Sequence, residues 1–205
     1  MKETSKALLL SLCAVLLVTA SVLGTMAYLT SQDQVVNTFT VGNVAITLDE
    51  KDVDNSTPGE NDRDKANAYK LMPGHNYEKD PIVHVDANSE DCYLFVKVVN
   101  EIANIEAEKT VAQQMTEKGW VAVDAANGIY VYTTDKTNPA VVTKGSNITV
   151  FENFTIAGNV DNTTLATYAD KTITVNAYAI QADGFAGKTA SEIWAVELVS
   201  TTNSL

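Results

Sequence analysis

The chain has 205 residues and carries 14 Lys and Arg against 26 Asp and Glu, a formal net charge of −12 at pH 7. A protein this acidic repels phosphate backbones and anionic headgroups, which argues against nucleic acids and anionic membranes as partners. If an N-terminal signal is removed, the remaining chain is still long enough for one ordinary domain with a hydrophobic core.

The first segment has the pattern of a secretory signal. Two lysines precede an apolar run over 7–23, and the small residues Thr25 and Ala27 follow it at the −3 and −1 positions of a cleavage site. We expect residues 1–27 to be a signal peptide that is cut between Ala27 and Tyr28, leaving a secreted chain without a stable membrane anchor. The alternative is a transmembrane anchor, since a run of seventeen residues lies at the lower limit for crossing a bilayer.

A strand-like segment follows the cleavage site directly. Residues 28–42 contain a run of β-branched and aromatic side chains that includes Val35, Val36, Phe39 and Val41. Cleavage would leave this strand at a free N-terminus, where it can add to the sheet of another molecule. We therefore predict an N-terminal donor-type strand over 28–42, with these four side chains as its assembly residues.

Strand patterns also dominate the rest of the chain. Short runs rich in Val, Ile, Thr, Tyr and Phe predict strands near 35–41, 43–49, 81–86, 91–100, 119–124, 129–134, 140–143, 147–157 and 171–182. Only two segments have helical patterns, 105–118 and 189–199. The predicted fold over 43–205 is mostly β, an antiparallel jelly roll or β-sandwich with two short helices.

Local signals predict where several of these elements begin and end. The pair Asn127-Gly128 between two strand runs indicates a hairpin turn, and Gly119 is placed to end the first helix.

The second helix carries its own start signal. Thr189 and Glu192 have the spacing of a capping box at its beginning. Its inner face is predicted to hold Ile193, Val196 and Leu198, with Trp194 nearby.

The longest stretch without a predicted element is an acidic loop over 49–68. An exposed, solvated loop is the first interpretation, because this stretch is rich in Asp and Glu and has a Pro-Gly pair in its middle. An EF-hand calcium loop counted from Asp52 fails, since its sixth position is Thr57 and its twelfth is Arg63. Weak calcium binding of another kind stays open for 49–64, but no metal or cofactor is predicted.

Residues that carry catalytic chemistry are few. The only histidines are His75 and His84, which lack the His-Glu-x-x-His spacing of a zinc protease, and His84 is predicted to face outward from a strand. Cys13 is expected to leave with the signal peptide, so that Cys92 has no cysteine to pair with and is predicted to be a buried, inert thiol. With no nucleophile elbow and no phosphate-binding loop, no catalytic residue is assigned.

Several segments together resemble one known family. They are 25–30 (Thr-Met-Ala-Tyr-Leu-Thr), 37–50, 69–81, 92–97 (Cys-Tyr-Leu-Phe-Val-Lys) and 177–185, the last followed by Trp194. In this order they resemble the TasA/camelysin-type proteins, which are secreted by Gram-positive bacteria and processed by a dedicated signal peptidase. The resemblance implies a jelly-roll domain that forms extracellular fibres of a biofilm matrix, in which the N-terminal strand of one subunit completes the sheet of the next.

Carried over to this chain, the resemblance makes about 28–41 the donor segment and Pro73-Gly74 a structural turn. The expected partners are further copies of the chain and a signal peptidase during export, with an accessory matrix protein left open. The expected location is the extracellular matrix or the cell surface.

Two other functions remain as alternatives. A monomeric adhesin or carbohydrate-binding module is suggested by the many tyrosines, although tyrosines in strands more often cover a sheet. A secreted metalloendopeptidase would have to use His75, His84 and a carboxylate, and the sequence gives no zinc-binding helix to support it.

Overall fold

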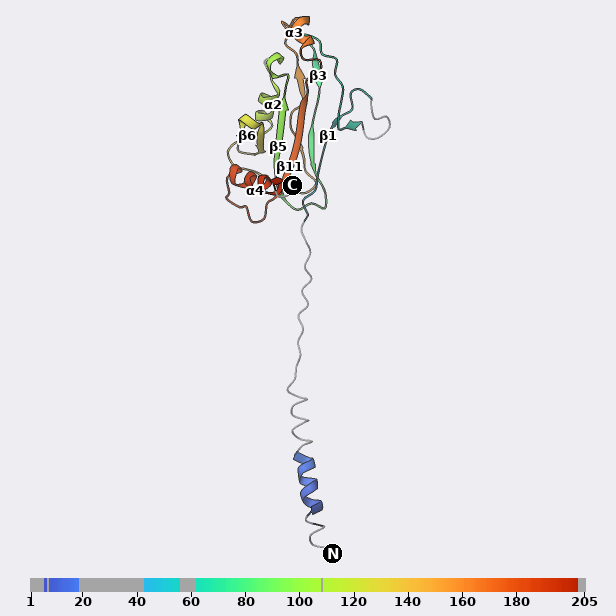
Figure 1. Cartoon of the computed structure of the whole chain (residues 1–205), viewed down its shortest axis with the longest axis vertical. Helices are drawn as coiled ribbons and strands as arrows, with labels where there is room; N and C mark the ends of the chain where they lie inside the picture. Colours follow the sequence, from blue (N-terminus) through green and yellow to red (C-terminus); the bar gives the residue numbers. More distant parts are fainter. Residues whose placement is uncertain (1–5, 7, 19–42, 56–61, 108, 203–205) are drawn as a thin grey trace. The chain divides into compact units, whose positions relative to one another are not determined.

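The computed structural model describes residues 6, 8–18, 43–55, 62–107 and 109–202 (Figure 1). The chain divides into two compact units, Met1–Val41 and Gly42–Leu205. Within the first unit, residues 8–18 form a helix with exposed leucines and valines, inside the predicted signal segment. None of the helices in the described part of the chain is both long and apolar enough to cross a membrane. The predicted cleavage site at Ala27-Tyr28 and the predicted strand over 35–41 lie outside the described residues.

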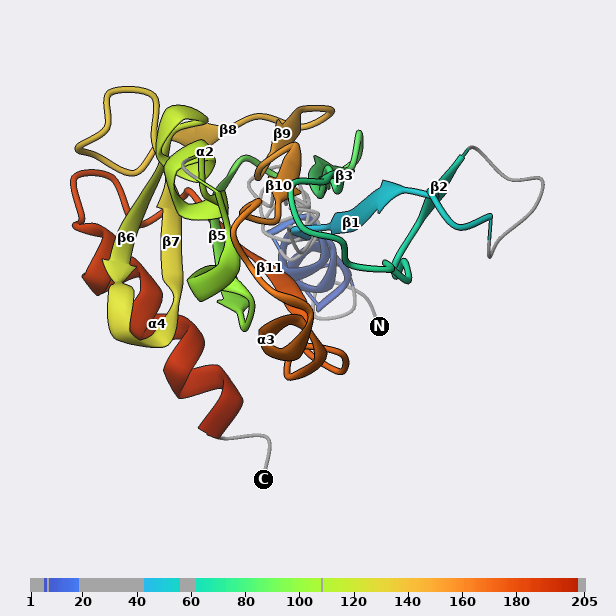
Figure 2. The ribbon, with the colours of Figure 1, turned by 90° about the horizontal axis from the view of Figure 1, so that it is seen from above.

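The second unit is built from antiparallel sheets, as the alternating patterns predict (Figure 2). One sheet has the order β2 (Arg63–Asp64), β1 (Ile46–Lys51), β4 (Ile82–Val85) and β9 (Asn147–Thr149). A larger sheet has the order β11 (Ile173–Gln181), β5 (Cys92–Asn100), β7 (Ile129–Tyr132) and β6 (Trp120–Asp124), and β8 (Val141–Val142) also pairs with β5. A third pair joins β10 (Asn153–Thr155) to β3 (Asn76–Glu78). The mostly β, antiparallel, sandwich-like fold is confirmed.

Strand β5 lies at the centre of the core because it is covered on both faces. Its residues 92–96 are all buried, which explains why this run is continuously apolar instead of alternating. On one face, Leu94 and Val96 belong to the main core together with Trp120. On the other face, Phe95 packs with the fully buried Ile193 of helix α4 (Ala190–Thr202). Helix α4 therefore adds a layer outside the larger sheet.

The two predicted helices exist, with changed boundaries. Helix α2 (Val111–Glu117) begins later than expected, because a capping box between Thr110 and Gln113 starts it. Residues 103–105 instead form a short 3₁₀ turn, η1 (Ala103–Ile105). Gly119 follows α2 with φ +93°, as its predicted stop requires.

Helix α4 starts with the predicted capping box, in which the backbone N–H of Thr189 donates to the carboxylate of Glu192 at 2.8 Å and the backbone N–H of Glu192 donates to the hydroxyl of Thr189 at 3.3 Å. The expected inner position of Val196 is wrong, since this side chain is 44% exposed, and the side chain of Leu198 lies outside the described part. A further helix, α3 (Asn162–Ala166), was not predicted; the side chain of Asp161 caps it.

The predicted strand over 147–157 is interrupted. It forms β9 and β10, and between them the adjacent side chains Val150 and Phe151 are both fully buried. Two neighbouring buried residues break the alternation that a single strand with one buried face would need. The short strands β2 and β3 gave no signal of their own in the sequence.

Two predicted turns are confirmed. The hairpin between β6 and β7 runs through η2 (Ala125–Asn127) and Gly128, whose φ is +69°. At Pro73-Gly74, the amide of His75 donates to the carbonyl of Met72 at 3.2 Å and Gly74 has φ +74°. Proline followed by a glycine of positive φ is the pattern of a type II turn.

Candidate functional site

The acidic loop predicted over 49–68 is in large part ordered structure. Asp49 and Glu50 belong to β1, and β2 pairs with the end of β1 through Glu50 with Asp64 and Lys51 with Arg63. Glu50 is only 4% exposed, so the interpretation of the whole stretch as a solvated loop is wrong. Residues 56–61, between the two strands, lie outside the described part. The sequence could not show that these acidic residues are buried and paired, because several of their partners, such as Lys79 and His84, lie outside the stretch.

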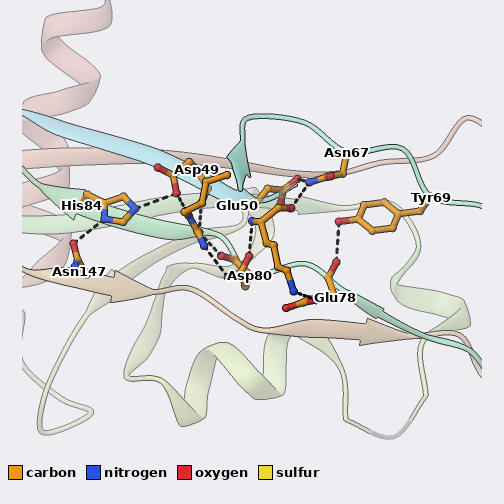
Figure 3. A network of polar contacts seen from close by, with 10 residues as sticks. Asp49, Glu50, Asn67, Tyr69, Glu78, Asp80, His84 and Asn147 are labelled. Atoms are coloured by element: carbon orange, nitrogen blue, oxygen red, sulfur yellow. Dashed lines mark hydrogen bonds and ion pairs between the residues drawn. The ribbon is translucent and has the colours of Figure 1, made fainter. Parts of the chain in front are cut away.

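Arg63 is the centre of a first group of polar contacts, which ties β2 to β1 and to the link between β3 and β4; Figure 3 shows Asp49, Asp80 and His84 of this group. Its guanidinium donates to the carboxylate of Asp49 and, at 3.0 Å, to the carboxylate of Asp80. It also donates to the backbone carbonyls of both residues, at 3.0 and 3.1 Å. A planar guanidinium with five donors suits this shared arrangement.

His84 completes this group from strand β4. Its Nε2 lies 3.0 Å from the Asp49 carboxylate and its Nδ1 lies 2.7 Å from the side-chain oxygen of Asn147. Burial alone would raise the pKa of Asp49, but hydrogen bonds from Arg63 and His84 outweigh it and hold the pKa below its ordinary value. The outward direction predicted for His84 is confirmed, since the residues on either side of it in β4 are buried and it is not.

Glu50 is the centre of a second, more deeply buried group. Its Oε2 lies 2.5 Å from Nζ of Lys79, and the side chains of Lys79 and Glu50 are 12% and 6% exposed. Its Oε1 accepts a hydrogen bond from Nδ2 of Asn67 at 3.0 Å. The same amide nitrogen donates to the carbonyl of Lys51 at 2.8 Å, and Oδ1 of Asn67 accepts from the backbone N–H of Val53 at 2.7 Å.

A groove of about 790 Å³ lies beside these contacts, between β1 and β11. Its apolar lining includes Ile46 and Leu48 from β1, and Ile173 and Val175 from β11. Phe154 also lines it. The four strand side chains are only partly buried although they pack against the main core. This part of the groove is therefore an open extension of the hydrophobic core, while polar and charged side chains line the rest of it.

The walls of the groove are strand edges. Among the described strands, β11 pairs only with β5. Strand β1 pairs with β4 along Ile46–Asp49 on one side, whereas on its other side β2 covers only Glu50 and Lys51. Figures 1 and 2 show β1 and β11 as neighbours, and no ladder joins them. An unpaired strand edge presents backbone donors and acceptors that a further strand can use.

The histidines predicted as alternative metal ligands have separate partners. The ring of His75 lies against Tyr77 with a centroid distance of 4.6 Å, while His84 contacts Asp49 and Asn147. Within the part of the chain that the structure describes, no group of three or more His, Cys, Asp and Glu is arranged to hold a metal ion.

Cys92 is fully buried, as predicted. Burial and the nearby charge of Asp91 raise the pKa of its thiol to about 11, which keeps it protonated and unreactive at neutral pH.

Two of the tyrosines help to close the end of the core beside the groove. The ring of Tyr77 stacks on Phe154 at 5.0 Å, and Tyr69 meets the edges of both rings. Burial, followed by the nearby charge of Glu50, raises the pKa of Tyr69. The hydroxyl of Tyr69 donates to the backbone carbonyl of Glu78 at 3.0 Å. These rings are engaged with each other, as expected of tyrosines that cover a sheet.

No family model, no curated protein and no solved structure matches this chain. The resemblance to TasA/camelysin-type proteins thus remains a prediction. The predicted assembly residues Val35, Val36, Phe39 and Val41 lie outside the described part of the chain. The groove was missed by sequence analysis, because its two walls are 127 residues apart at Ile46 and Ile173 and no local pattern indicates that they meet.

Proposed function

We propose that this protein is a secreted structural subunit of extracellular fibres, and that the segment 28–41 of one copy pairs within the groove between β1 and β11 of the next. The observation that carries the proposal is the groove itself, a channel between two strand edges with apolar side chains on both walls. A strand placed there would gain backbone hydrogen bonds from the edges and bury its apolar side chains.

The alternation of the N-terminal segment suits such a site. Val35, Phe39 and Val41 occupy odd positions and would point to one face of a strand, while Thr38 and Thr40 would point to the other. The apolar face can rest on the lining of the groove, and the threonines can face solvent. This refines the predicted assembly residues, since Val36 falls on the same face as the threonines.

The chain leading into β1 favours a second copy as the recipient. The carbonyls of Asn43 and Ala45 accept hydrogen bonds from the amides of Glu90 and Asp86, both at 2.9 Å. Residues 43–45 therefore continue the line of β1 along 86–90 and do not turn toward the groove. For residues 35–41 to enter the groove of their own chain, a sharp reversal at Gly42 would be required. Donation to another copy needs no reversal.

The test is electron microscopy of the chain 28–205 beside the chain 42–205, at matched concentrations. Fibres from the longer chain alone support assembly through the N-terminal strand. Fibres from both chains would contradict it, and monomers from both would favour the adhesin alternative.

A peptide experiment tests the groove separately. A synthetic peptide of residues 28–41 should bind the chain 42–205, and chemical-shift changes should concentrate on β1 and β11. A control peptide with Phe39→Lys should bind far more weakly than one with Thr40→Lys, since only the first alters the apolar face. Equal binding of the two peptides would argue against the proposed orientation.

A further inference from the structure

We propose that Lys79 and Asn67 join through a spontaneous intramolecular isopeptide bond, with Glu50 between them as the proton carrier. The three side chains are also part of the lining of the groove, but the proposal does not rest on the proposed function and stands whether or not the chain forms fibres. It would give a chain without an intrachain disulfide a covalent link between two separate segments, the stretch after β2 and the link between β3 and β4.

The geometry that points to this reaction is a lysine and an asparagine sharing one carboxylate. Nζ of Lys79 lies 2.5 Å from Oε2 of Glu50, and Nδ2 of Asn67 lies 3.0 Å from Oε1 of the same group. The nucleophile and the leaving nitrogen are thus both in contact with one acid–base group, as general acid–base catalysis requires. The long, flexible stem of lysine allows Nζ to turn from the Glu50 carboxylate toward Cγ of Asn67.

The amide of Asn67 is held in the orientation that the reaction needs. Its Oδ1 accepts the backbone N–H of Val53 at 2.7 Å, and its Nδ2 also donates to the carbonyl of Lys51 at 2.8 Å. A backbone donor on Oδ1 stabilises the negative charge that develops there when Cγ is attacked. The carbonyl of Lys51 can accept a hydrogen bond from the departing ammonia.

The surroundings exclude most of the water that could attack Cγ of Asn67 in place of Lys79. The side chain of Glu50 is 6% exposed and that of Lys79 12%, and neutral products are favoured over a buried ion pair in such a place. The neighbouring ion pair Lys51–Glu78 is different, because its side chains are 48% and 52% exposed. Lys51 is therefore a suitable control residue for Lys79.

The reaction balances without any added reagent. The ammonium of Lys79 passes a proton to Glu50, and the neutral amine attacks Cγ of Asn67 to form the new C–N bond. Glu50 then gives this proton to Nδ2 and accepts one from Nζ. The bond between Cγ and Nδ2 breaks, the carbonyl of Asn67 re-forms, and neutral ammonia leaves. The product is an amide between the two side chains, and Glu50 keeps the proton it accepted from Nζ, so that neutral groups replace the buried ion pair.

Mass spectrometry of the purified full chain tests the proposal. The intact mass should be lower by one ammonia than the sequence requires. Trypsin should leave the peptide 66–70 joined to 71–97, since a linked Lys79 is no longer a cleavage site. This digest separates the link from succinimide formation at another asparagine, which also loses ammonia. Separate peptides 66–70 and 71–79 as the main products would overturn the proposal and leave a hydrogen-bonded ion pair.

Variants assign the role of each group. Glu50→Gln keeps the shape of the side chain but cannot carry the proton, so the branched peptide should be lost. Lys79→Arg removes the nucleophile and should have the same effect, whereas the control Lys51→Arg should stay fully linked. Circular dichroism verifies that each variant is folded. A Glu50→Gln protein that is still linked would refute the role of Glu50.

Discussion

The groove between β1 and β11 makes a prediction that can be measured as a change in assembly. Val175 lines the groove from β11 and lies opposite Val98, on the face of the sheet that packs toward the main core. The next residue, Asn176, lies opposite Lys97 and is exposed. Because successive side chains of a strand point to opposite faces, Val175→Glu places a carboxylate in the groove, and Asn176→Glu places the same charge outside it.

The expected size of the effect follows from what an inserted strand would bury. Val175 is already partly buried, so its contact with the inserted strand is worth about 1 kcal/mol, roughly half of full burial. Covering a carboxylate that has no partner costs a further ~2 kcal/mol. The sum of about 3 kcal/mol corresponds to a ~100-fold higher concentration for assembly.

The assay is the concentration dependence of fibre formation by the chain 28–205, followed by sedimentation and electron microscopy. Val175→Glu should raise the critical concentration by this factor while the protein stays folded by circular dichroism. Asn176→Glu should leave it nearly unchanged. The reasoning is refuted if the folded Val175→Glu chain assembles like the unchanged protein, or if both variants are impaired equally.

Three further predictions concern the domain itself. A Cβ at Gly128 would lie 2.2 Å from a backbone carbonyl oxygen, so Gly128→Ala should lower the free energy of unfolding in urea by more than the ~1 kcal/mol of backbone strain alone. Gly145→Ala is the control, because Gly145 has a similar φ but open space around it. An equal loss of stability in both variants would contradict the steric argument. Hydrogen bonds from the backbone N–H and the hydroxyl of Thr189 lower the pKa of Glu192 to about 2, so Thr189→Ala, which removes only the hydroxyl, should raise this pKa part of the way to its ordinary value in an NMR titration and destabilise α4 by about 1 kcal/mol. Because the folded pKa is depressed, this capping contribution is present at neutral pH and is lost as the pH falls toward about 2. Cys92 in the chain 28–205 should react with a thiol reagent only upon unfolding, since burial keeps it protonated; rapid labelling of the native protein would show that the strand opens.

Much of the fold could be predicted because its signals are local. Alternation located β11 to within two residues at either end, and the Thr189–Glu192 spacing marked the start of α4. Strand β3 was missed because its three residues are too short for a period to be recognised. Val196 was misplaced because an inner face was assigned from helical spacing alone, whereas the sheet that α4 covers contacts only part of that face.

What the sequence by itself determined is therefore the class of the fold, the order of most strands and helices, and their turns and caps, since each depends on side chains a few positions apart. The tertiary structure alone decided that β1 and β11 meet as two edges around a groove with apolar side chains on both walls. It also decided that Glu50, expected in a solvated loop, is buried between Lys79 and Asn67. Both results come from contacts between residues distant in the chain. Their energy depends on burial and on the packing of whole sheets, which no local pattern encodes.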